Sequence, residues 1–188
     1  MQIRNAIESD ALSIARLHAA SWRGTYRGML SDAYLDGPVE AERLSLWRER
    51  FAQPTSNQHV IVAESAGEIA GFACAYGNDD ARWGTLLENI HVCQAHKRQG
   101  VGSKLLRAVA SWSAQAHSGQ GLYLWVLKPN LGAQQFYGRL GAKNVGSDVW
   151  SPPDGGAVPQ LRFAWQQAQA LLYPVANPSF NGTPNGAR

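Results

Sequence analysis

A short glycine turn between a strand pattern and a helix pattern constrains the fold of this chain more than any other feature. Residues 85–92 have the apolar pattern of a strand, and a basic pair, Lys97 and Arg98, then leads into glycines at 100 and 102. Apolar residues at helical spacing follow as far as residue 112, and a second strand pattern occupies residues 122–127. This order predicts a parallel crossover, because parallel strands need a long connection between them. We therefore expect a mixed α/β fold.

The same turn predicts a binding site for an anion. Gly100 and Gly102 let the backbone turn sharply and approach a ligand closely, and the N-terminus of the following helix carries about half a positive charge. A phosphate or a pyrophosphate is the expected ligand. The net charge is only +3, and the other basic residues are scattered. The charge alone therefore implies no nucleic-acid partner, and it fits a site for an anionic cofactor.

The other patterns predict strands and helices in a single domain, residues 1–172. The expected strands are residues 2–6, 59–64, 69–76, 142–150 and 158–165, of which 59–64 and 69–76 form an antiparallel hairpin. The expected helices begin at residue 11 and span residues 40–51 and 133–140, whereas Gly24 and Gly28 break the aromatic segment 21–36. Residues 173–188 have no apolar face to bury, so we expect them to form a disordered tail.

The sequence also excludes some classes of protein. No apolar run approaches the roughly 18 residues that cross a bilayer, and the first residues lack the apolar stretch of a signal peptide. The two cysteines, Cys74 and Cys93, have no metal-ligand spacing around them, so we expect neither a disulfide nor a metal site. We expect a cytoplasmic protein that associates with no membrane.

Two blocks of residues resemble the GCN5-related N-acetyltransferase (GNAT) superfamily. Residues 97–102 are similar to its acyl-CoA pyrophosphate loop, and residues 130–142 resemble its second signature. The resemblance covers residues 2–166 and implies a central, mostly antiparallel sheet with one splayed parallel strand pair, flanked by helices. A dinucleotide-binding fold would need a third glycine where Leu105 stands, and a kinase-type phosphate loop would need Lys before Ser, whereas Ser103 precedes Lys104.

The resemblance implies acetyl-CoA as the co-substrate. Strand 85–92 would diverge from strand 122–127, and its unpaired backbone at Ile90 and Val92 would pair with the pantetheine arm. The pyrophosphate would bind the loop backbone, although Lys97 stands where Arg or Gln is usual and lacks their bidentate pairing. The residues expected to bind the cofactor are Ile90, Val92, Lys97, Arg98, Gln99, Gly100, Val101, Gly102, Ser103, Asn130, Ala133 and Phe136. Asn130 would bind the pantetheine, cap its own helix, or do both.

Acyl transfer to an amine needs a group that removes a proton, because an alkyl ammonium is only about one part in a thousand neutral at pH 7. Glu88 shares the parity of Ile90 and Val92, so it would face the same groove as a general base, or as a structural or substrate-orienting group. His91 would point to the opposite face and pack there. The resemblance implies that Tyr137 donates a proton to the departing thiolate. No Cys or Ser is placed as a nucleophile, so we expect direct transfer in a ternary complex.

The acceptor is expected to be a primary amine of a small molecule or peptide. Trp22, Tyr26, Tyr34 and Trp125 are candidate walls for its site, although burial in a core explains the same residues equally well. Relatives that acetylate ribosomal proteins usually have Glu where Trp125 stands, which argues against that acceptor. The alternative to an enzyme is a catalytically silent acyl-CoA sensor, which would keep the glycines without using Tyr137. The resemblance leaves a homodimer open in either case, because superfamily members often dimerise.

Overall fold

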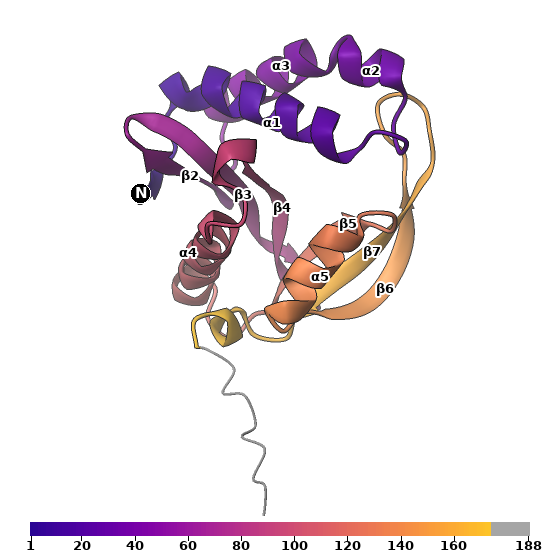
Figure 1. Ribbon diagram of the computed structural model, residues 1–188. Coiled ribbons are helices and arrows are strands. Elements are labelled where there is room, and N and C mark those ends of the chain that lie inside the picture. Colours follow the sequence, from indigo (N-terminus) through magenta and orange to yellow (C-terminus); the bar gives the residue numbers. More distant parts are fainter. Residues whose placement is uncertain (174–188) are drawn as a thin grey trace, which may run out of the picture.

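One mixed sheet of seven strands organises the chain, in the order β1-β2-β3-β4-β5-β7-β6 (Figure 1). The computed structural model describes residues 1–173, so the predicted tail at 173–188 lies outside the described residues except for Tyr173. All neighbouring strands are antiparallel except β4 and β5, which are parallel. The strands are β1 (Gln2–Asn5), β2 (Gln58–Ser65), β3 (Glu68–Asp80), β4 (Gly84–Val92), β5 (Leu122–Leu127), β6 (Lys143–Trp150) and β7 (Val158–Trp165). The predicted mixed fold, its hairpin and its parallel pair are confirmed.

Helices cover both faces of the sheet (Figure 1). On one face lie α1 (Ala11–Thr25), α2 (Asp32–Asp36) and α3 (Val39–Ala52), and on the other lie α4 (Val101–Ala116) and α5 (Leu131–Arg139). Short 3-10 turns are η1 (Glu8–Asp10), η2 (Gln94–His96) and η3 (Ala168–Leu171). Within residues 1–173, no helix has the length and apolarity that crossing a membrane requires.

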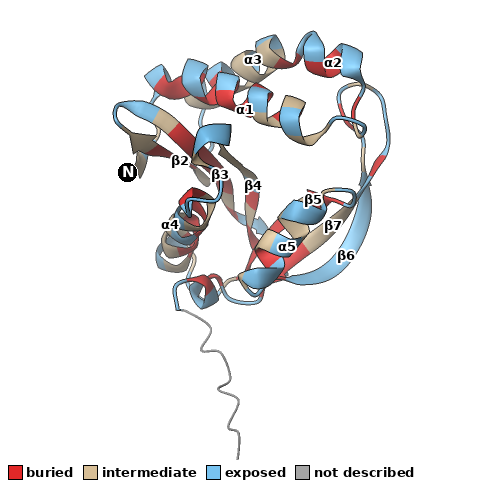
Figure 2. Cartoon of the chain, in the orientation of Figure 1, coloured by how far each residue is buried: buried red, intermediate tan, exposed pale blue. Residues whose placement is uncertain are grey.

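Alternation along the strands builds a separate core on each face (Figure 2). In β3, Ala73 and Ala75 pack with α4, whereas Phe72 and Cys74 pack with α1 and α3. This period of two is what a sheet buried on both faces requires, because successive side chains point to opposite sides. Strand β6 differs, since seven of its eight residues are exposed at the edge of the sheet.

Helix α1 continues through Gly24, so the predicted break at this glycine is wrong. A glycine inside a helix costs about 1 kcal/mol relative to alanine. Trp22 in the same turn is 7% exposed and packs with Leu30, Tyr34 and Leu35. Burying a side chain of that size contributes more than the glycine costs, so the helix ends only at Thr25. Gly28, with φ of +75°, lies in the turn that follows.

The parallel strands β4 and β5 are joined at one end and separate at the other. They pair only at Thr85 with Leu122 and at Leu86 with Tyr123. Strand β4 continues alongside β3 as far as Val92, and β5 continues alongside β7 as far as Leu127. The facing edges of β4 and β5 are therefore unpaired with each other beyond Leu86. The sheet opens along a V, which we call the splay.

Candidate active site

The glycine loop at the end of β4 has the backbone geometry of an anion-binding concavity. Gly100 is the N-cap of α4 and has φ of +80°, in the left-handed region that favours glycine. Arg98 is also left-handed, with φ of +60°. No side chain among residues 1–173 caps the helix, so the first-turn amides point towards whatever lies beyond the N-terminus. Alternating left-handed residues and free helix amides together form the kind of nest that binds phosphate groups.

Gly102 holds the loop against two other elements of the predicted cofactor site. A Cβ atom at this position would lie 3.4 Å from Cζ of Phe136 and 3.8 Å from Cγ2 of Val92. The end of β4, the start of α4 and the middle of α5 therefore meet here. Val101, beside it, is 1% exposed and packs in the core, so only its backbone amide is available to a ligand.

The other predicted cofactor residues lie around the same opening. Ile90 and Val92 pair with Ala73 and Gly71 of β3, and their side chains pack with those of α4. Lys97 and Gln99 are exposed in the loop, where Nε2 of Gln99 donates to the carbonyl oxygen of Ala95 at 2.8 Å.

Asn130 caps helix α5. Its Oδ1 accepts a hydrogen bond from the amide of Ala133 at 3.1 Å. This is one of the two roles that the sequence left open, and the contact with pantetheine stays a prediction. Ala133 and Phe136 face the core from the same helix, so the cap fixes the turn that presents them.

Tyr137 is buried at the inner face of α5. It is 7% exposed, and its ring packs edge-on against Phe136 and Trp165, with ring centroids 5.0 and 6.3 Å away. Burial raises the pKa of its phenol, and the nearby phenol of Tyr26 raises it further. Burial also raises the pKa of Tyr26 to about 12. Both hydroxyls therefore keep their protons at neutral pH and are hydrogen-bond donors.

Glu88 does not share the face of Ile90 and Val92, so that part of the prediction is wrong. Cys74 pairs with Asn89 and Ala75 with Leu87, which leaves Glu88 as the extra residue of a β-bulge. The bulge reverses the alternation, and Glu88 and Asn89 both bind Arg50 of α3. The Nη2 atom of Arg50 lies 2.7 Å from Oε2 of Glu88, and Nη1 donates to Oδ1 of Asn89 at 3.0 Å. The carboxylate thus lies on the face covered by α1 and α3, with its side chain 34% exposed.

His91 packs on the α1–α3 face, as predicted. Its Nδ1 lies 2.8 Å from Oγ of Ser21, and its ring lies 4.6 Å from the ring of His18. Burial, together with the charges of Lys97 and Arg43, lowers the pKa of His91 to about 3. His18 is fully buried and its pKa is also well below the ordinary value, chiefly through burial. Both rings are therefore neutral near pH 7.

Two of the four predicted wall residues belong to a core. Trp22 and Tyr34 are 7% and 6% exposed in the cluster beneath α2, and the hydroxyl of Tyr34 donates to Glu42 at 2.6 Å. Tyr26 and Trp125 are only half-buried. The ring of Trp125 stacks with Arg162, whose Cζ lies 4.5 Å from the ring centroid.

The sequence reasoning missed Arg50 and Arg162. Arg50 could not have been found, because its two partners on β4 depend on a bulge that no periodicity shows. Arg162 had a signal, since it alternates with the apolar residues Phe163 and Leu161 in a predicted strand and must point away from their face.

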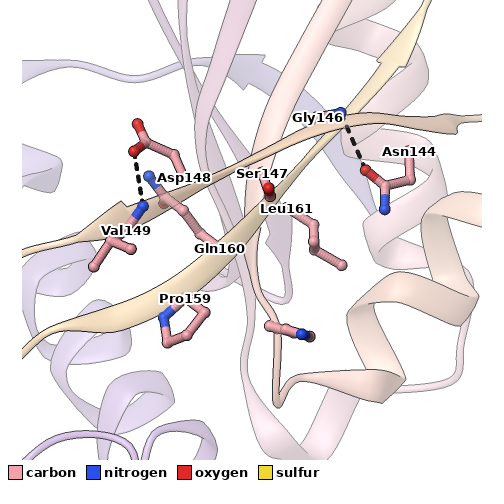
Figure 3. A pocket seen from close by; sticks show the side chains of 9 residues that line it. Asn144, Gly146, Ser147, Asp148, Val149, Pro159, Gln160 and Leu161 are labelled. Carbon is pink, nitrogen blue, oxygen red and sulfur yellow. Dashed lines mark hydrogen bonds between the residues drawn. The ribbon is translucent and has the colours of Figure 1, made fainter.

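A hollow of about 670 Å³ lies elsewhere, over the β6–β7 hairpin (Figure 3). None of the predicted site residues lines it. Asn144 and Asp148 on its rim accept hydrogen bonds from backbone amides of their own strand, those of Gly146 and Val149. The hollow is therefore the surface of an exposed edge strand, apart from the splay and the glycine loop.

Comparisons with known proteins agree with this geometry. The model of the acetyltransferase (GNAT) family matches residues 17–142. The uncharacterised N-acetyltransferase YuaI of Bacillus subtilis is 27% identical over 90% of this chain and 95% of its own length. A probable N-acetyltransferase of Mycobacterium tuberculosis is also 27% identical, over 87% of this chain and 92% of its own. The PaiA N-acetyltransferase of Thermoplasma acidophilum, solved with coenzyme A, has the same fold, with a TM-score of 0.66 at 17% identity over 85% of this chain and 96% of its own.

Proposed function

The chain belongs to the GNAT family of acetyltransferases, and on that premise we propose that it transfers the acetyl group of acetyl-CoA directly to a primary amine of a small molecule or peptide. One observation carries the proposal. The unpaired edge of β4 leads straight from the splay to the left-handed loop at the N-terminus of α4. A free strand edge that leads into an anion-binding loop suits a ligand that has both an amide-bearing arm and a pyrophosphate.

The residues around the splay fit acetyl-CoA, which supplies an acyl thioester whose sulfur departs as a thiolate. The backbone of Ile90 and Val92 would pair with the pantetheine amides. The amides of the loop from Arg98 to Ser103 would bind the pyrophosphate, with the charge of Lys97 nearby. A Cβ atom at Gly102 would be in van der Waals contact with Phe136 and Val92, so a larger side chain there would have to fit between them.

Tyr137 is the proposed hydrogen-bond donor to the departing thiolate, because a phenol with a raised pKa is a weaker acid than the thiol and stabilises the sulfur while keeping its proton. The raised pKa of its buried phenol keeps the Oη–H protonated at neutral pH. The hydroxyl is therefore a hydrogen-bond donor to the departing sulfur, whose ordinary thiol pKa lies near 8.5. Groups positioned in this way typically contribute about 10²- to 10⁴-fold to a rate.

Glu88 is the proposed partner of the acceptor amine, as its base or as the group that orients it. The carboxylate is partly exposed at the bulge, and its ion pair with Arg50 fixes its direction. The bulge moves it away from the face of Ile90 and Val92. An acceptor that uses Glu88 must therefore enter from the α1–α3 side of the sheet.

Direct transfer agrees with the position of the one thiol near the loop. Sγ of Cys93 lies 3.0 Å from Nδ1 of His96, and its side chain packs on the α1–α3 face. Ile90 and Phe136 pack on the opposite face, with α4. Cys93 also follows the last residue of β4, beside the proposed pyrophosphate site and away from Glu88, so its thiol is poorly placed to accept an acyl group.

The test is thiol release from acetyl-CoA with polyamines, aminoglycosides, free amino acids and short peptides. We expect saturable release with one class of amine, and a kcat about 10²-fold or more lower in Tyr137→Phe, with little change in the KM for acetyl-CoA. Tyr173→Phe, which removes an exposed hydroxyl, is the matched control. Binding of acetyl-CoA without release to any amine would favour the sensor, and absence of binding would refute the site itself.

A further inference from the structure

Arg162 lies on the face of the sheet that α4 and α5 leave uncovered. It stands in β7 between Leu161 and Phe163, which pack with the α4 core, so its side chain points to the opposite face. It pairs across the sheet with Trp125 of β5. Leu124 and Val126 belong to the α4 core, so Trp125 shares the face of Arg162.

The guanidinium of Arg162 is surrounded by aromatic rings. Its Cζ lies 4.5 Å from the ring centroid of Trp125, 5.5 Å from that of Tyr123 and 5.7 Å from that of Trp83. The Nε atom is buried and has no hydrogen-bond partner within the described residues. A buried N–H without a partner is costly, which makes it a strong donor for any acceptor that reaches it.

The nearest carboxylates are engaged elsewhere. Asp79 accepts the hydroxyl hydrogen of Tyr123. Asp80 accepts from the backbone amides of Arg82 and Trp83, at 2.7 and 2.9 Å. Neither forms an ion pair with Arg162 in the part of the chain that the structure describes.

Arg162 and Glu88 flank the opening of the splay from its two sides. The last parallel pair is Leu86 with Tyr123. Two residues further along each strand stand Glu88 on β4 and Trp125, the ring partner of Arg162, on β5. The bulge turns Glu88 to the α1–α3 face, which is also the face of Trp125 and Arg162. One face of the splay thus carries an acidic group on one strand and a basic group beside the other.

We infer that Arg162 binds the carboxylate of the acceptor, and that the acceptor is an amine that carries a carboxylate, such as an amino acid or a short peptide. This inference rests on the proposed function and narrows its acceptor. The planar guanidinium donates to both oxygens of a carboxylate, and the aromatic rings exclude water from that pairing. A single cation among apolar rings matches one negative charge better than the two of a phosphate. The ammonium end of the same molecule would face Glu88.

Product binding tests the inference without any turnover. We would titrate the CoA-saturated protein with N-acetylphenylalanine and N-acetylalanine, and with N-phenethylacetamide and N-ethylacetamide, which lack the carboxylate. The readout is calorimetry, supported by the fluorescence of Trp83 and Trp125. At least one carboxylate should bind about 10- to 100-fold more tightly than its partner. Arg162→Gln should abolish that difference, and Arg162→Lys should keep part of it, because the charge remains and the fork is lost.

Arg82→Gln is the matched control. Arg82 also lies over an aromatic ring, with its Cζ 4.6 Å from the ring centroid of Trp83, but it is exposed. The Arg82→Gln variant should keep the preference for ligands that carry a carboxylate. No preference in the unmodified protein, or a preference that survives in Arg162→Gln, would overturn the inference.

Thiol release gives a second readout, in which failure of the inference and failure of the proposed function give different results. Phenylalanine and alanine should be better acceptors than phenethylamine and ethylamine, and Arg162→Gln should lower kcat/KM for the carboxylates alone. If the uncharged amines are acetylated equally well, the inference fails while the proposed function stands. If no amine is acetylated, the proposed function fails, and the product titration still decides the role of Arg162.

Discussion

The neutral pair of His18, which is fully buried, and His91, which is half-buried, should make the protein lose stability in weak acid. The folded pKa of His91 is about 3, whereas an unfolded histidine titrates near 6.5. Because the folded pKa is the lower one, the unfolded chain binds protons that the folded protein does not. The contribution of the neutral histidine to stability is therefore fully present above about pH 6.5 and is lost as the pH falls towards the folded pKa. Between pH 7 and pH 5, His91 alone removes about 2 kcal/mol from the free energy of unfolding.

Replacing His91 with glutamine tests this value. At pH 7, His91→Gln should lower the free energy of unfolding by about 1 kcal/mol through lost packing on Phe72. Between pH 7 and pH 5, the free energy of unfolding of this variant should fall by about 2 kcal/mol less than that of the unmodified protein. Urea unfolding at pH 7, 6 and 5, followed by tryptophan fluorescence, measures both quantities. Val109→Ala, a core truncation in α4, should lower stability without changing the pH dependence. An equal loss from pH 7 to pH 5 in His91→Gln and the unmodified protein would refute the reasoning.

Three further outcomes are expected. Gly100→Asp should abolish acetyl-CoA binding in a calorimetric titration, because it adds negative charge and backbone strain at the anion nest. Gly119→Asp changes an equally left-handed glycine beyond the other end of α4, and this control should bind acetyl-CoA normally. Glu88→Gln should lower kcat about 10²-fold or more if this carboxylate takes the amine proton, with unchanged acetyl-CoA affinity; an unaltered kcat rules out the base. Asn130→Ala should cost about 1 kcal/mol of unfolding free energy through loss of the α5 cap, and a urea midpoint equal to that of the unmodified protein contradicts this.

The sequence predicted the elements whose signals are local. The glycine loop, the strand before it and the helix after it each depend on a few neighbouring residues. The structure has the strand within one residue of its expected bounds and begins the helix directly after Gly100. The splay was expected from the family resemblance, because no local pattern says where two distant strands stop pairing. Gly24 was misjudged because the packing of Trp22 outweighs the weak helix propensity of a single glycine.

The candidate site was predictable in its backbone and less so in its side chains. The bulge at Glu88 inserts one residue without changing composition or hydropathy, so counting parity along β4 gave the wrong face. Burial of Tyr34 depends on α2 and α3 packing together around it, which aromatic content alone does not reveal. The surroundings of Arg162 depend on the tertiary structure, because two rings of β5 and one from the turn before β4 meet around its guanidinium.

The narrow contact between β4 and β5 divides the sheet into two plates joined along a short seam. Strands β1 to β4 form one plate and β5 to β7 the other, and only two residue pairs link their backbones. The α4 core, which includes Ala73 from one plate and Leu124 and Phe163 from the other, also joins them, as does the hydrogen bond from Tyr123 of β5 to Asp79 of β3. A ligand that pairs with the free edge of either plate and contacts the other becomes a structural part of the sheet. The temperature of unfolding should then rise with acetyl-CoA concentration, and slowed amide exchange should concentrate along the seam.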